Sequence, residues 1–526
     1  MDRLAMMDAA RGRSAPWDIV VIGGGATGAG VAVDAATRGL DVLLLEREDF
    51  GKGTSSRSTK LVHGGVRYLE QGNISLVMEA LKERGILRQN APHLVHDLAF
   101  VVPNYSWWEA PFYGIGMKVY DLLAGKYGFG KSRMLSLEET LERLPTIQTE
   151  GLRGGVMYYD GQFDDSRLLI HLMMTAAENG ATLLNYAEAA AISKGADGFV
   201  NGVTVHDSES GERFEAAAKV VINATGIFAD ETRRMCEFNV QPMIAPSQGI
   251  HLVFERSFLR GETAIMVPHT SDGRVMFAIP WHEHTLVGTT DTPIDGPSYD
   301  PLPFEQEIDF VLETASLYLS HPPTRKDILS VYTGIRPLVK AGAGAGKTSA
   351  LSRDHTIHVD GSGLLTIVGG KWTTYRRMAQ DCVDHAVLLG GLAEAECVTE
   401  TLSIHGYTED VDELTNLGVY GSDAAAVLAL ATADPELGKQ LHPALPYVGA
   451  EVVWAVRKEM ARTLDDVLAR RLRALFLNTE AALAMAPAVA RLMARELGRD
   501  ESWVAAQLAD FRVVAKAYQP SSATAK

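Results

Sequence analysis

The sequence predicts an α/β protein with a Rossmann-like nucleotide-binding domain, an inserted α+β domain and a C-terminal helical domain. Three observations indicate this architecture. A strand–helix–strand unit with a glycine-rich turn stands near the N-terminus, two strand-and-glycine segments follow at long intervals, and the last part of the chain is rich in Ala and Leu. The 526 residues exceed what one simple core supports, and the 46% of hydrophobic residues can fill several cores.

The N-terminal unit covers residues 16–49, PWDIVVIGGGATGAGVAVDAATRGLDVLLLERED. One apolar run enters the glycine turn, an alanine-rich helix follows, and a second apolar run ends at Glu46. Gly23 permits the tight turn, Gly25 lets a pyrophosphate approach the backbone, and Gly28 brings the helix against the strand. The carboxylate of Glu46 is placed to accept a ribose hydroxyl, which favours an adenosine ribose without a 2′-phosphate. We therefore predict a dinucleotide site.

Two later segments favour FAD over NAD. Residues 216–230, AAAKVVINATGIFAD, predict a strand that ends in a close turn at Ala224 and Gly226. Residues 364–368 predict another strand, followed by two glycines and a helix that begins near Thr373 or Thr374. The N-terminus of that helix could stabilise negative charge on a reduced flavin, although an ordinary strand–helix connection would have the same sequence. Three separated segments that meet on one cofactor suit the long FAD molecule.

Composition and charge exclude several functions. The net charge of −17 argues against broad nucleic-acid binding, and we expect no metal site. The three cysteines form no CxxC pair and fit a reducing, cytoplasmic compartment. Residues 1–16 lack a signal-peptide core, so we expect a disordered lead-in, and no apolar run is long enough to span a bilayer. Residues 105–130, rich in Trp, Tyr and Phe, are typical of an interfacial element or of an ordinary aromatic surface.

Six ordered motifs carry a family resemblance. They are TSSRSTKLVHGGVRYLEQG, QGIHLVF, FAIPWHEHTLVGTTDTP, YTGIRPL, SRDHT and GGKWTTYR. Together they resemble the FAD-dependent glycerol-3-phosphate dehydrogenases of aerobic metabolism, in the D-amino-acid-oxidase-like flavoprotein group, over nearly the whole chain. The resemblance implies oxidation of sn-glycerol 3-phosphate to dihydroxyacetone phosphate by hydride transfer to flavin N5. It also implies ubiquinone or menaquinone as acceptor and peripheral association with the cytoplasmic face of the inner membrane, and it is compatible with a homodimer.

The same motifs assign site residues. A phosphomonoester dianion needs cationic donors, preferably guanidinium groups. The predicted substrate-binding residues are Arg67, Tyr68, Thr289, Thr290, Arg336, Arg353 and Lys371. The predicted catalytic residues are His251, as donor or base, Arg336, which could stabilise a developing alkoxide, and His63, as a flavin neighbour. The predicted cofactor-binding residues are Gly23, Gly25, Ala26, Thr27, Gly28, Glu46, Thr54, Ser55, Ser58, Lys60, Leu61, His63, Gly64, Gly65, Ala189, Ala224, Gly226, Gly334, Gly370, Lys371, Thr373 and Thr374.

Taken singly, these residues have ordinary readings. A single cation is more often a solvated surface residue, and a core histidine can be satisfied by a backbone carbonyl. Asp164, Asp165 and Arg167 are interpreted as a helix cap and a salt bridge, because no second acid–base group is placed for hydrolysis.

Several alternative functions stay open. They are a glycerol-3-phosphate oxidase that uses oxygen, an amine or 2-hydroxy-acid oxidoreductase on the same fold, and a nucleotide switch. The switch hypothesis rests on AGAGAGKT at residues 341–348, which resembles a phosphate loop. Pro337 and two charges precede that segment and a strand pattern follows it, so the context disfavours a phosphate loop.

The predicted layout is discontinuous. The FAD-binding domain comprises residues 16–100, 155–235 and 330–395, and the substrate-binding domain comprises 101–154 and 236–329, with a hairpin near Thr270 to Gly273. Residues 396–526 form the C-terminal helical domain, and the final QPSSATAK is predicted to be a frayed tail.

Overall fold

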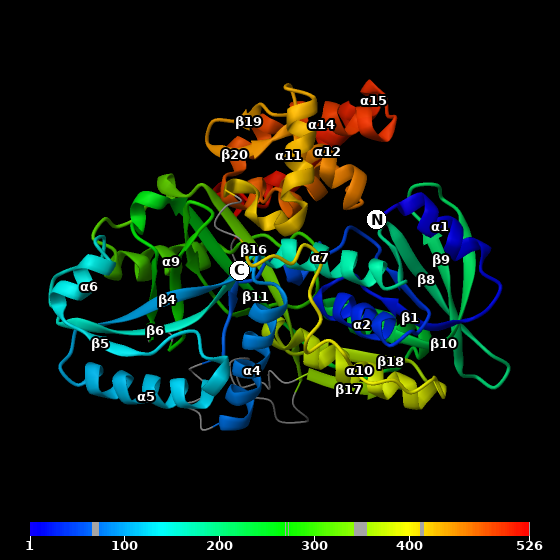
Figure 1. The fold of residues 1–526 in the computed structure, drawn as a ribbon, viewed down its shortest axis with the longest axis horizontal. Coiled ribbons are helices and arrows are strands. Elements are labelled where there is room, and N and C mark those ends of the chain that lie inside the picture. Colours follow the sequence, from blue (N-terminus) through cyan, green and yellow to red (C-terminus); the bar gives the residue numbers. More distant parts are fainter. Residues whose placement is uncertain (66–72, 269, 272, 341–354, 411–414, 525–526) are drawn as a thin grey trace.

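The computed structural model describes residues 1–65, 73–268, 270–271, 273–340, 355–410 and 415–524. Two domains, each built on a β-sheet, lie side by side, and a helical C-terminal domain rests on both of them (Figure 1). Within the part of the chain that the structure describes, no helix is both long and apolar enough to cross a membrane. The segment AGAGAGKT lies outside the described residues.

The first sheet has a parallel centre. Its strand order is β17 (His355–Val359), β18 (Leu365–Gly369), β10 (Arg213–Asn223), β1 (Trp17–Ile22), β2 (Val42–Leu45) and β7 (Thr182–Leu184). The strands from β18 to β7 run parallel, whereas β17 runs antiparallel to β18. The carboxyl ends of β1, β2, β10 and β18 therefore meet at one edge, where open α/β sheets bind their ligands.

Both faces of this sheet are covered. Helices α2 (Ala26–Thr37), α7 (Asp165–Glu178) and α10 (Tyr375–Gly390) pack on one face and form a shared apolar core with it. The other face packs against α1 (Arg3–Gly12), β8 (Ala187–Lys194) and β9 (Val200–Asp207). Burial on both faces explains why β1 and β2 are continuous apolar runs and do not alternate with polar residues.

The second sheet is larger and mostly antiparallel. Its strand order is β15 (Thr292–Pro293), β11 (Ile244–Glu255), β14 (His284–Gly288), β13 (Met276–Trp281), β12 (Thr263–Val267), β4 (Val95–Asn104), β6 (Gly154–Phe163) and β3 (Leu61–Val62). In addition, β16 (Ser330–Val339) pairs with β11, and β5 (Arg133–Leu135) pairs with β6. Proline has no amide hydrogen to donate to a neighbouring strand. Pro337 is tolerated in β16 because, among the described residues, this strand pairs with β11 on one side and with no strand on the other.

Helices that flank the second sheet include α4 (Ile74–Asn90), α5 (Glu109–Ala124), α6 (Leu137–Arg143) and α9 (Glu305–Tyr318). The core under α9 is apolar and includes Ile250, Val287 and Val311. The predicted hairpin is present as β12 and β13, with the amide of Thr270 donating to the carbonyl of Arg274 at 2.9 Å.

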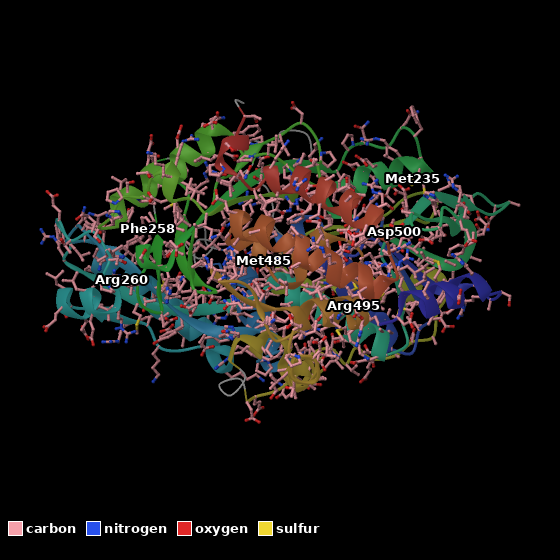
Figure 2. All side chains as sticks on the ribbon, turned by 90° about the horizontal axis from the view of Figure 1, so that it is seen from above. Met235, Phe258, Arg260, Met485, Arg495 and Asp500 are labelled. Atoms are coloured by element: carbon pink, nitrogen blue, oxygen red, sulfur yellow. The ribbon has the colours of Figure 1, made fainter. Side chains whose placement is uncertain are left out.

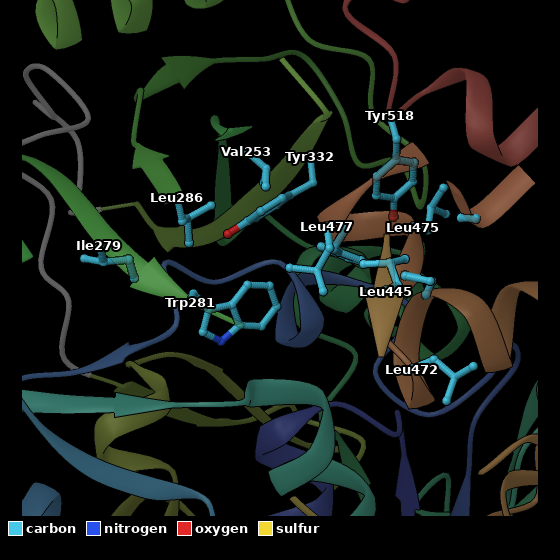
Figure 3. Packing of buried hydrophobic residues seen from close by; sticks show 14 of the residues in the cluster. Val253, Ile279, Trp281, Leu286, Tyr332, Leu445, Leu472, Leu475, Leu477 and Tyr518 are labelled. Atoms are coloured by element: carbon cyan, nitrogen blue, oxygen red, sulfur yellow. The ribbon is translucent and has the colours of Figure 1, made fainter. Parts of the chain in front are cut away.

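The C-terminal domain consists mainly of helices. They include α11 (Ala424–Ala433), α12 (Gly449–Lys458), α13 (Ala474–Leu477), α14 (Thr479–Leu497) and α15 (Glu501–Lys516), together with the small hairpin of β19 (Gln440–His442) and β20 (Leu445–Val448). Seen from above, α14 with Met485 crosses the middle of the molecule (Figure 2). Leu475, Leu477 and Tyr518 of this domain pack with Trp281 and Tyr332 of the second sheet (Figure 3).

Both termini are better ordered than the sequence predicts. Residues 3–12 form α1, whose Asp2 caps the helix and whose Met7 and Ala10 are buried. Arg3 holds α1 in place through an ion pair with Asp207 at 2.6 Å. At the other end, Thr524 pairs with Phe304, so the predicted fraying does not apply up to that residue. Sequence reasoning predicts disorder for such short terminal segments, because the residues that hold them in place lie hundreds of positions away in the chain.

The interpretation of Asp164 and Asp165 as structural residues is confirmed. The carboxylate of Asp164 accepts the amide of Arg167 at the start of α7, and Arg167 forms a two-pronged ion pair with Glu459. The domain boundaries themselves remain a proposal. Because β4, β6 and β16 belong to the second sheet, sheet membership favours assigning residues 95–100, 155–163 and 330–339 to the substrate-binding domain.

Candidate active site

Two adjoining cavities lie at the carboxyl edge of the first sheet. The smaller, of about 210 Å³, lies at the glycine turn and β2, and the larger, of about 350 Å³, lies between the two sheets. Both are lined by the same segment around Gly370 and by Thr54 and Pro337. An elongated, two-part space of this kind suits a ligand with two distinct ends.

The glycine turn is packed tightly against its surroundings. A Cβ atom on Gly28 would lie 1.9 Å from the carbonyl oxygen of Gly23, so only glycine allows the helix to approach the strand here. The amide of Ala26, at the first turn of α2, donates to the hydroxyl of Ser55 at 2.9 Å. The helix N-terminus and its amides therefore face the smaller cavity, in the arrangement that binds phosphate groups.

Glu46 directly follows β2 and lines the same cavity. Its carboxylate accepts the amides of Gly24 at 2.7 Å and Glu48 at 2.8 Å. Burial raises the pKa of Glu46 to about 7, although those two amides act in the opposite direction. A ribose hydroxyl placed here would meet a carboxylate that is already oriented, which agrees with the predicted role.

The middle of the site is fastened by hydrogen bonds between segments far apart in the chain. Thr54 donates to the carbonyl of Ile335 at 2.6 Å, and the indole of Trp372 donates to the carbonyl of Ser55 at 2.8 Å. The amide of His63 donates to the hydroxyl of Thr373 at 3.2 Å. These bonds join the 54–63 segment to β16 and to the start of α10.

His251 lies on β11 at the wall of the larger cavity and is 3% exposed. Its Nε2 is 2.9 Å from the hydroxyl of Thr59, and its ring stacks on Tyr332 with the centroids 4.7 Å apart. Burial lowers the pKa of His251 well below its ordinary value, and the charges of Lys60 and Arg336 lower it further. Among the described residues, Nδ1 of His251 has no hydrogen-bond partner. The imidazole is therefore neutral near pH 7 and able to accept a proton.

Arg336 reaches the larger cavity from β16, directly opposite Ser247 of β11. Its guanidinium lies 3.3 Å from the hydroxyl of Thr289 and 3.5 Å from the carboxylate of Asp291. Asp291 in turn accepts a short hydrogen bond from Ser247. The charge of Arg336 is thus oriented beside the cavity while its side chain remains 26% exposed.

The turn that carries Thr289 and Thr290 is held by Glu307 of α9. This buried carboxylate accepts the hydroxyls of Thr290 at 2.8 Å and Thr292 at 2.7 Å. The hydroxyl of Thr290 also accepts the amide of Ile250 at 3.0 Å. Thr290 therefore acts in the wall of the cavity, and Thr289 is the member of the pair that contacts Arg336.

Most of the predicted site residues meet at these two cavities. Those at the larger cavity are Thr54, Ser58, Leu61, His63, Gly65, His251, Thr289, Thr290, Gly334, Arg336, Gly370, Lys371 and Thr373. Those at the smaller cavity are Gly23, Gly25, Ala26, Thr27, Glu46, Thr54, Ser55, Ala189, Ala224, Gly226, Gly370 and Lys371. Arg67, Tyr68 and Arg353 lie outside the described residues.

Four predicted cofactor residues line neither cavity, namely Gly28, Lys60, Gly64 and Thr374. Lys60 is fully buried and pairs with Asp165 at 2.7 Å, behind the wall that His251 forms. The amide of Gly64 donates to the hydroxyl of Tyr120 at 2.9 Å. These contacts indicate that Lys60 and Gly64 support the structure next to the site and do not line it.

Sequence reasoning missed other residues of the site. Thr59 lies within the motif TSSRSTKLVHGGVRYLEQG, but nothing in that motif indicates that the hydroxyl of Thr59 contacts His251. Asp291, in the same turn as Thr289, and Glu307 of α9 support that turn through contacts that appear only in three dimensions. Most of the apolar part of the larger cavity was also missed; besides the predicted Leu61, it is lined by Tyr158, Met266, Pro268, Val275 and Phe277.

Comparison with known proteins agrees with this geometry. Residues 18–376 match the family model described as FAD dependent oxidoreductase, and residues 364–503 match the C-terminal domain of alpha-glycerophosphate oxidase. The chain is 42% identical to a mitochondrial glycerol-3-phosphate dehydrogenase of Arabidopsis thaliana, over 93% of this chain and 84% of that protein. The chain belongs to the FAD-dependent glycerol-3-phosphate dehydrogenase family. A mitochondrial relative from Mus musculus is 41% identical over 92% of this chain and 71% of its own length.

Solved structures support the same assignment. The glycerol-3-phosphate dehydrogenase from Bacillus halodurans, complexed with FAD, is similar with a TM-score of 0.79 and 30% identity over 98% of this chain and 97% of that one. The L-alpha-glycerophosphate oxidase from Mycoplasma pneumoniae, with a TM-score of 0.55 and 18% identity over 73% of this chain and 98% of that one, shares the fold.

The residues of this family member fit FAD as its cofactor. The smaller cavity suits the adenosine diphosphate part of FAD. It is lined by the first turn of α2, which the close packing at Gly28 brings against β1, and by the carboxylate of Glu46. The larger cavity, at the start of α10, has room for the flavin ring and a small substrate. This dehydrogenase fold therefore provides one continuous cofactor site.

Proposed function

We propose that this protein oxidises sn-glycerol 3-phosphate to dihydroxyacetone phosphate and passes the electrons to a membrane quinone. The observation that carries the proposal is the convergence of Arg336, Lys371 and His251 on one cavity that continues into a dinucleotide site. A small anionic alcohol needs this combination of cations and a proton acceptor. When bound, FAD accepts the hydride from C2 of the alcohol.

Each residue has a role in this proposal. Arg336 and Lys371 bind the phosphate or the developing alkoxide from one side of the cavity, and Arg67 and Arg353 are predicted to add to this charge. His251 receives the proton of the C2 hydroxyl, because it lines the larger cavity and its lowered pKa favours the neutral imidazole, the form that can accept a proton. Thr59 holds the ring in position, and the Tyr332 ring beneath it prevents the imidazole from tilting away.

Turnover with a panel of small substrates tests the reaction class. We expect activity with glycerol 3-phosphate and a quinone analogue, and at least hundredfold lower kcat/KM with glycerol, lactate and amino acids, because these lack the phosphate dianion. Faster turnover with a 2-hydroxy acid or an amine would replace this proposal with the alternative oxidoreductase.

Replacing His251 with Gln should lower the rate of flavin reduction about 10²- to 10³-fold, which is the range of a general base. The amount of bound FAD should not change, because the smaller cavity, which suits the adenosine diphosphate part, stays intact. The measurement is single-turnover reduction by stopped-flow absorbance. His358→Gln, an exposed histidine of β17, is the matched control and should reduce at the wild-type rate. An unchanged rate in His251→Gln would remove His251 as the proton acceptor.

The apolar part of the larger cavity supports a quinone as acceptor. Tyr158, Met266 and Phe277 present a wall suited to a flat, uncharged ring. The experiment mixes substrate-reduced enzyme either with a short-chain quinone or with oxygenated buffer. Reoxidation by the quinone at least tenfold faster than by oxygen at equal concentration supports a dehydrogenase, and the reverse order supports an oxidase.

Helix α5 supports attachment to a membrane surface. Phe112, Ile115 and Leu122 lie along one side of α5 and are 52%, 68% and 79% exposed, and Trp107 before the helix is 78% exposed. The opposite side, with Tyr113, Met117 and Tyr120, is buried in the core. A helix with two apolar sides, one of them open to solvent, is the form that lies in a bilayer interface.

Replacing Trp107, Ile115 and Leu122 together with Ser should weaken binding to lipid vesicles by at least tenfold, because about 0.8 kcal/mol is lost for each CH₂ group no longer buried in lipid. Vesicle flotation measures this binding. A matched control replaces Leu317 of α9 and Leu388 of α10, which are 69% and 78% exposed, with Ser. Equal vesicle binding by both variants and the wild type would exclude α5 as the attachment surface.

The association of two copies of this chain into a homodimer remains a prediction.

A further inference from the structure

A loop from the second sheet domain lies at the cofactor cavity of the first. This loop, residues 294–304, connects β15 to α9 and carries Tyr299 to the smaller cavity. The centroid of the Tyr299 ring is 4.5 Å from that of Phe228, which follows β10. The guanidinium of Arg47 lies 5.1 Å from the Tyr299 ring and 5.2 Å from the Phe228 ring. Three side chains from separate parts of the chain therefore form one cluster.

The cluster stands at the adenosine end of the cavity. Arg47 directly follows Glu46, the predicted ribose ligand, and it is 3.7 Å from Glu188, which precedes Ala189. Glu46, Arg47, Glu188, Ala189 and Tyr299 all line the same space. Aromatic rings and a guanidinium plane are the surfaces on which a purine stacks.

The loop is fastened directly beside Tyr299. Its neighbour Asp300 forms ion pairs with Arg57 at 2.8 Å and with Lys52 at 3.3 Å. Lys52 also pairs with Asp465 of the C-terminal domain at 2.7 Å. These contacts connect the loop to the first sheet domain and to the C-terminal domain at one point.

The end of the loop is held by the C-terminal tail. The amide of Thr524 donates to the carbonyl of Pro303 at 3.0 Å, and the amide of Glu305 donates to the carbonyl of Thr524 at 2.9 Å. The position of Tyr299 is thus determined by segments from all three domains. A surface loop with no role at the cavity would not need this many long-range anchors.

We propose that residues 294–304 form a strap that retains the cofactor, with Tyr299 and Arg47 closing the adenosine half of the cavity. The strap slows release of FAD without contacting the reacting end of the site. Asp300 is a positioning residue, because it acts through the place it gives to Tyr299. The second sheet domain thereby contributes to holding the cofactor as well as the substrate.

Release of FAD from the full-length holoenzyme tests the strap. The holoenzyme is diluted into excess FAD-binding apoprotein as a trap, and the rise or loss of flavin fluorescence gives the rate of dissociation. Tyr299→Ala should dissociate about tenfold faster, since a stacked ring together with a cation–π contact corresponds to about that factor. Tyr299→Phe keeps the ring and should dissociate within about twofold of the wild type.

A second variant tests the anchor, with a matched control on the same loop. Asp300→Asn should speed FAD release several-fold with Tyr299 intact, whereas Asp295→Asn, an exposed residue of this loop, should leave the rate unchanged. Wild-type release from both Tyr299→Ala and Tyr299→Leu would overturn the proposal. Thermal unfolding of each apoprotein shows that the variant is folded. These measurements need no substrate, so their outcome is separate from whether glycerol 3-phosphate is oxidised.

Discussion

Replacing Arg336 with Ala is expected to lower kcat/KM for glycerol 3-phosphate by about 30- to 5,000-fold. Removing one partner of a buried, charge-assisted contact costs about 2–5 kcal/mol, and the loss applies to the ground state and to the developing alkoxide. FAD content should remain that of the wild type, because the smaller cavity, which suits the adenosine diphosphate part, stays intact. Single-turnover reduction and the visible flavin spectrum measure the two effects separately.

Arg336→Lys is the informative companion variant. It keeps the positive charge but loses the fork geometry that contacts Thr289 and Asp291, so we expect an intermediate rate. Arg512 of α15, an exposed arginine that lines neither cavity, supplies the control as Arg512→Ala. If Arg336→Ala reduced its flavin at the wild-type rate, Arg336 would have no place in substrate binding.

The second large effect concerns stability. Asp49, just after β2, accepts ion pairs from Arg470 and Arg471 of the C-terminal domain, and all three residues are buried. Asp49→Ala leaves two buried guanidinium groups without this partner, which should lower the free energy of unfolding by about 3–5 kcal/mol. Urea unfolding followed by circular dichroism measures the change. Asp18→Ala, whose partner Lys219 is half exposed, should cost less than about 1 kcal/mol.

This contact also predicts a pH dependence. Burial alone raises the pKa of Asp49, but Arg471 and Arg470 outweigh burial and hold the pKa below its ordinary value. A carboxylate with a lowered pKa stabilises the fold above its unfolded pKa of about 3.9, and this contribution disappears as the pH falls through the folded pKa. The stability difference between wild type and Asp49→Ala should therefore be full near pH 7 and shrink below about pH 4. A difference that stayed constant down to pH 3 would contradict the ion-pair account.

The fold could be predicted from sequence wherever local patterns determine it. The run from 42 to 45 is β2, and the glycine turn between Ile22 and Ala26 determines where α2 begins. These elements are recognisable because each glycine answers a steric requirement of its immediate surroundings. The parallel pairing of β1 with β2 follows from the same strand–helix–strand unit.

Other features depend on distant partners. The helix at residues 3–12 is stable because Arg3 reaches Asp207, and no local signal marks that pair. The sequence of Ser330 to Val339 does not indicate which of the two sheets this segment joins, because its pairing with β11 is a contact between segments far apart in the chain. For the site, motif resemblance supplied His251 and Arg336, but Thr59, Glu307 and Tyr299 are brought there only by tertiary contacts.

The most direct test of the central claim is anaerobic reduction of the purified holoenzyme. Glycerol 3-phosphate is added without oxygen or quinone, and the visible absorbance band of the bound flavin is followed in time. The account predicts that this band bleaches with one equivalent of substrate per flavin and that dihydroxyacetone phosphate is formed in the same amount. A flavin that stays oxidised at saturating glycerol 3-phosphate, in protein shown to contain FAD, would contradict it.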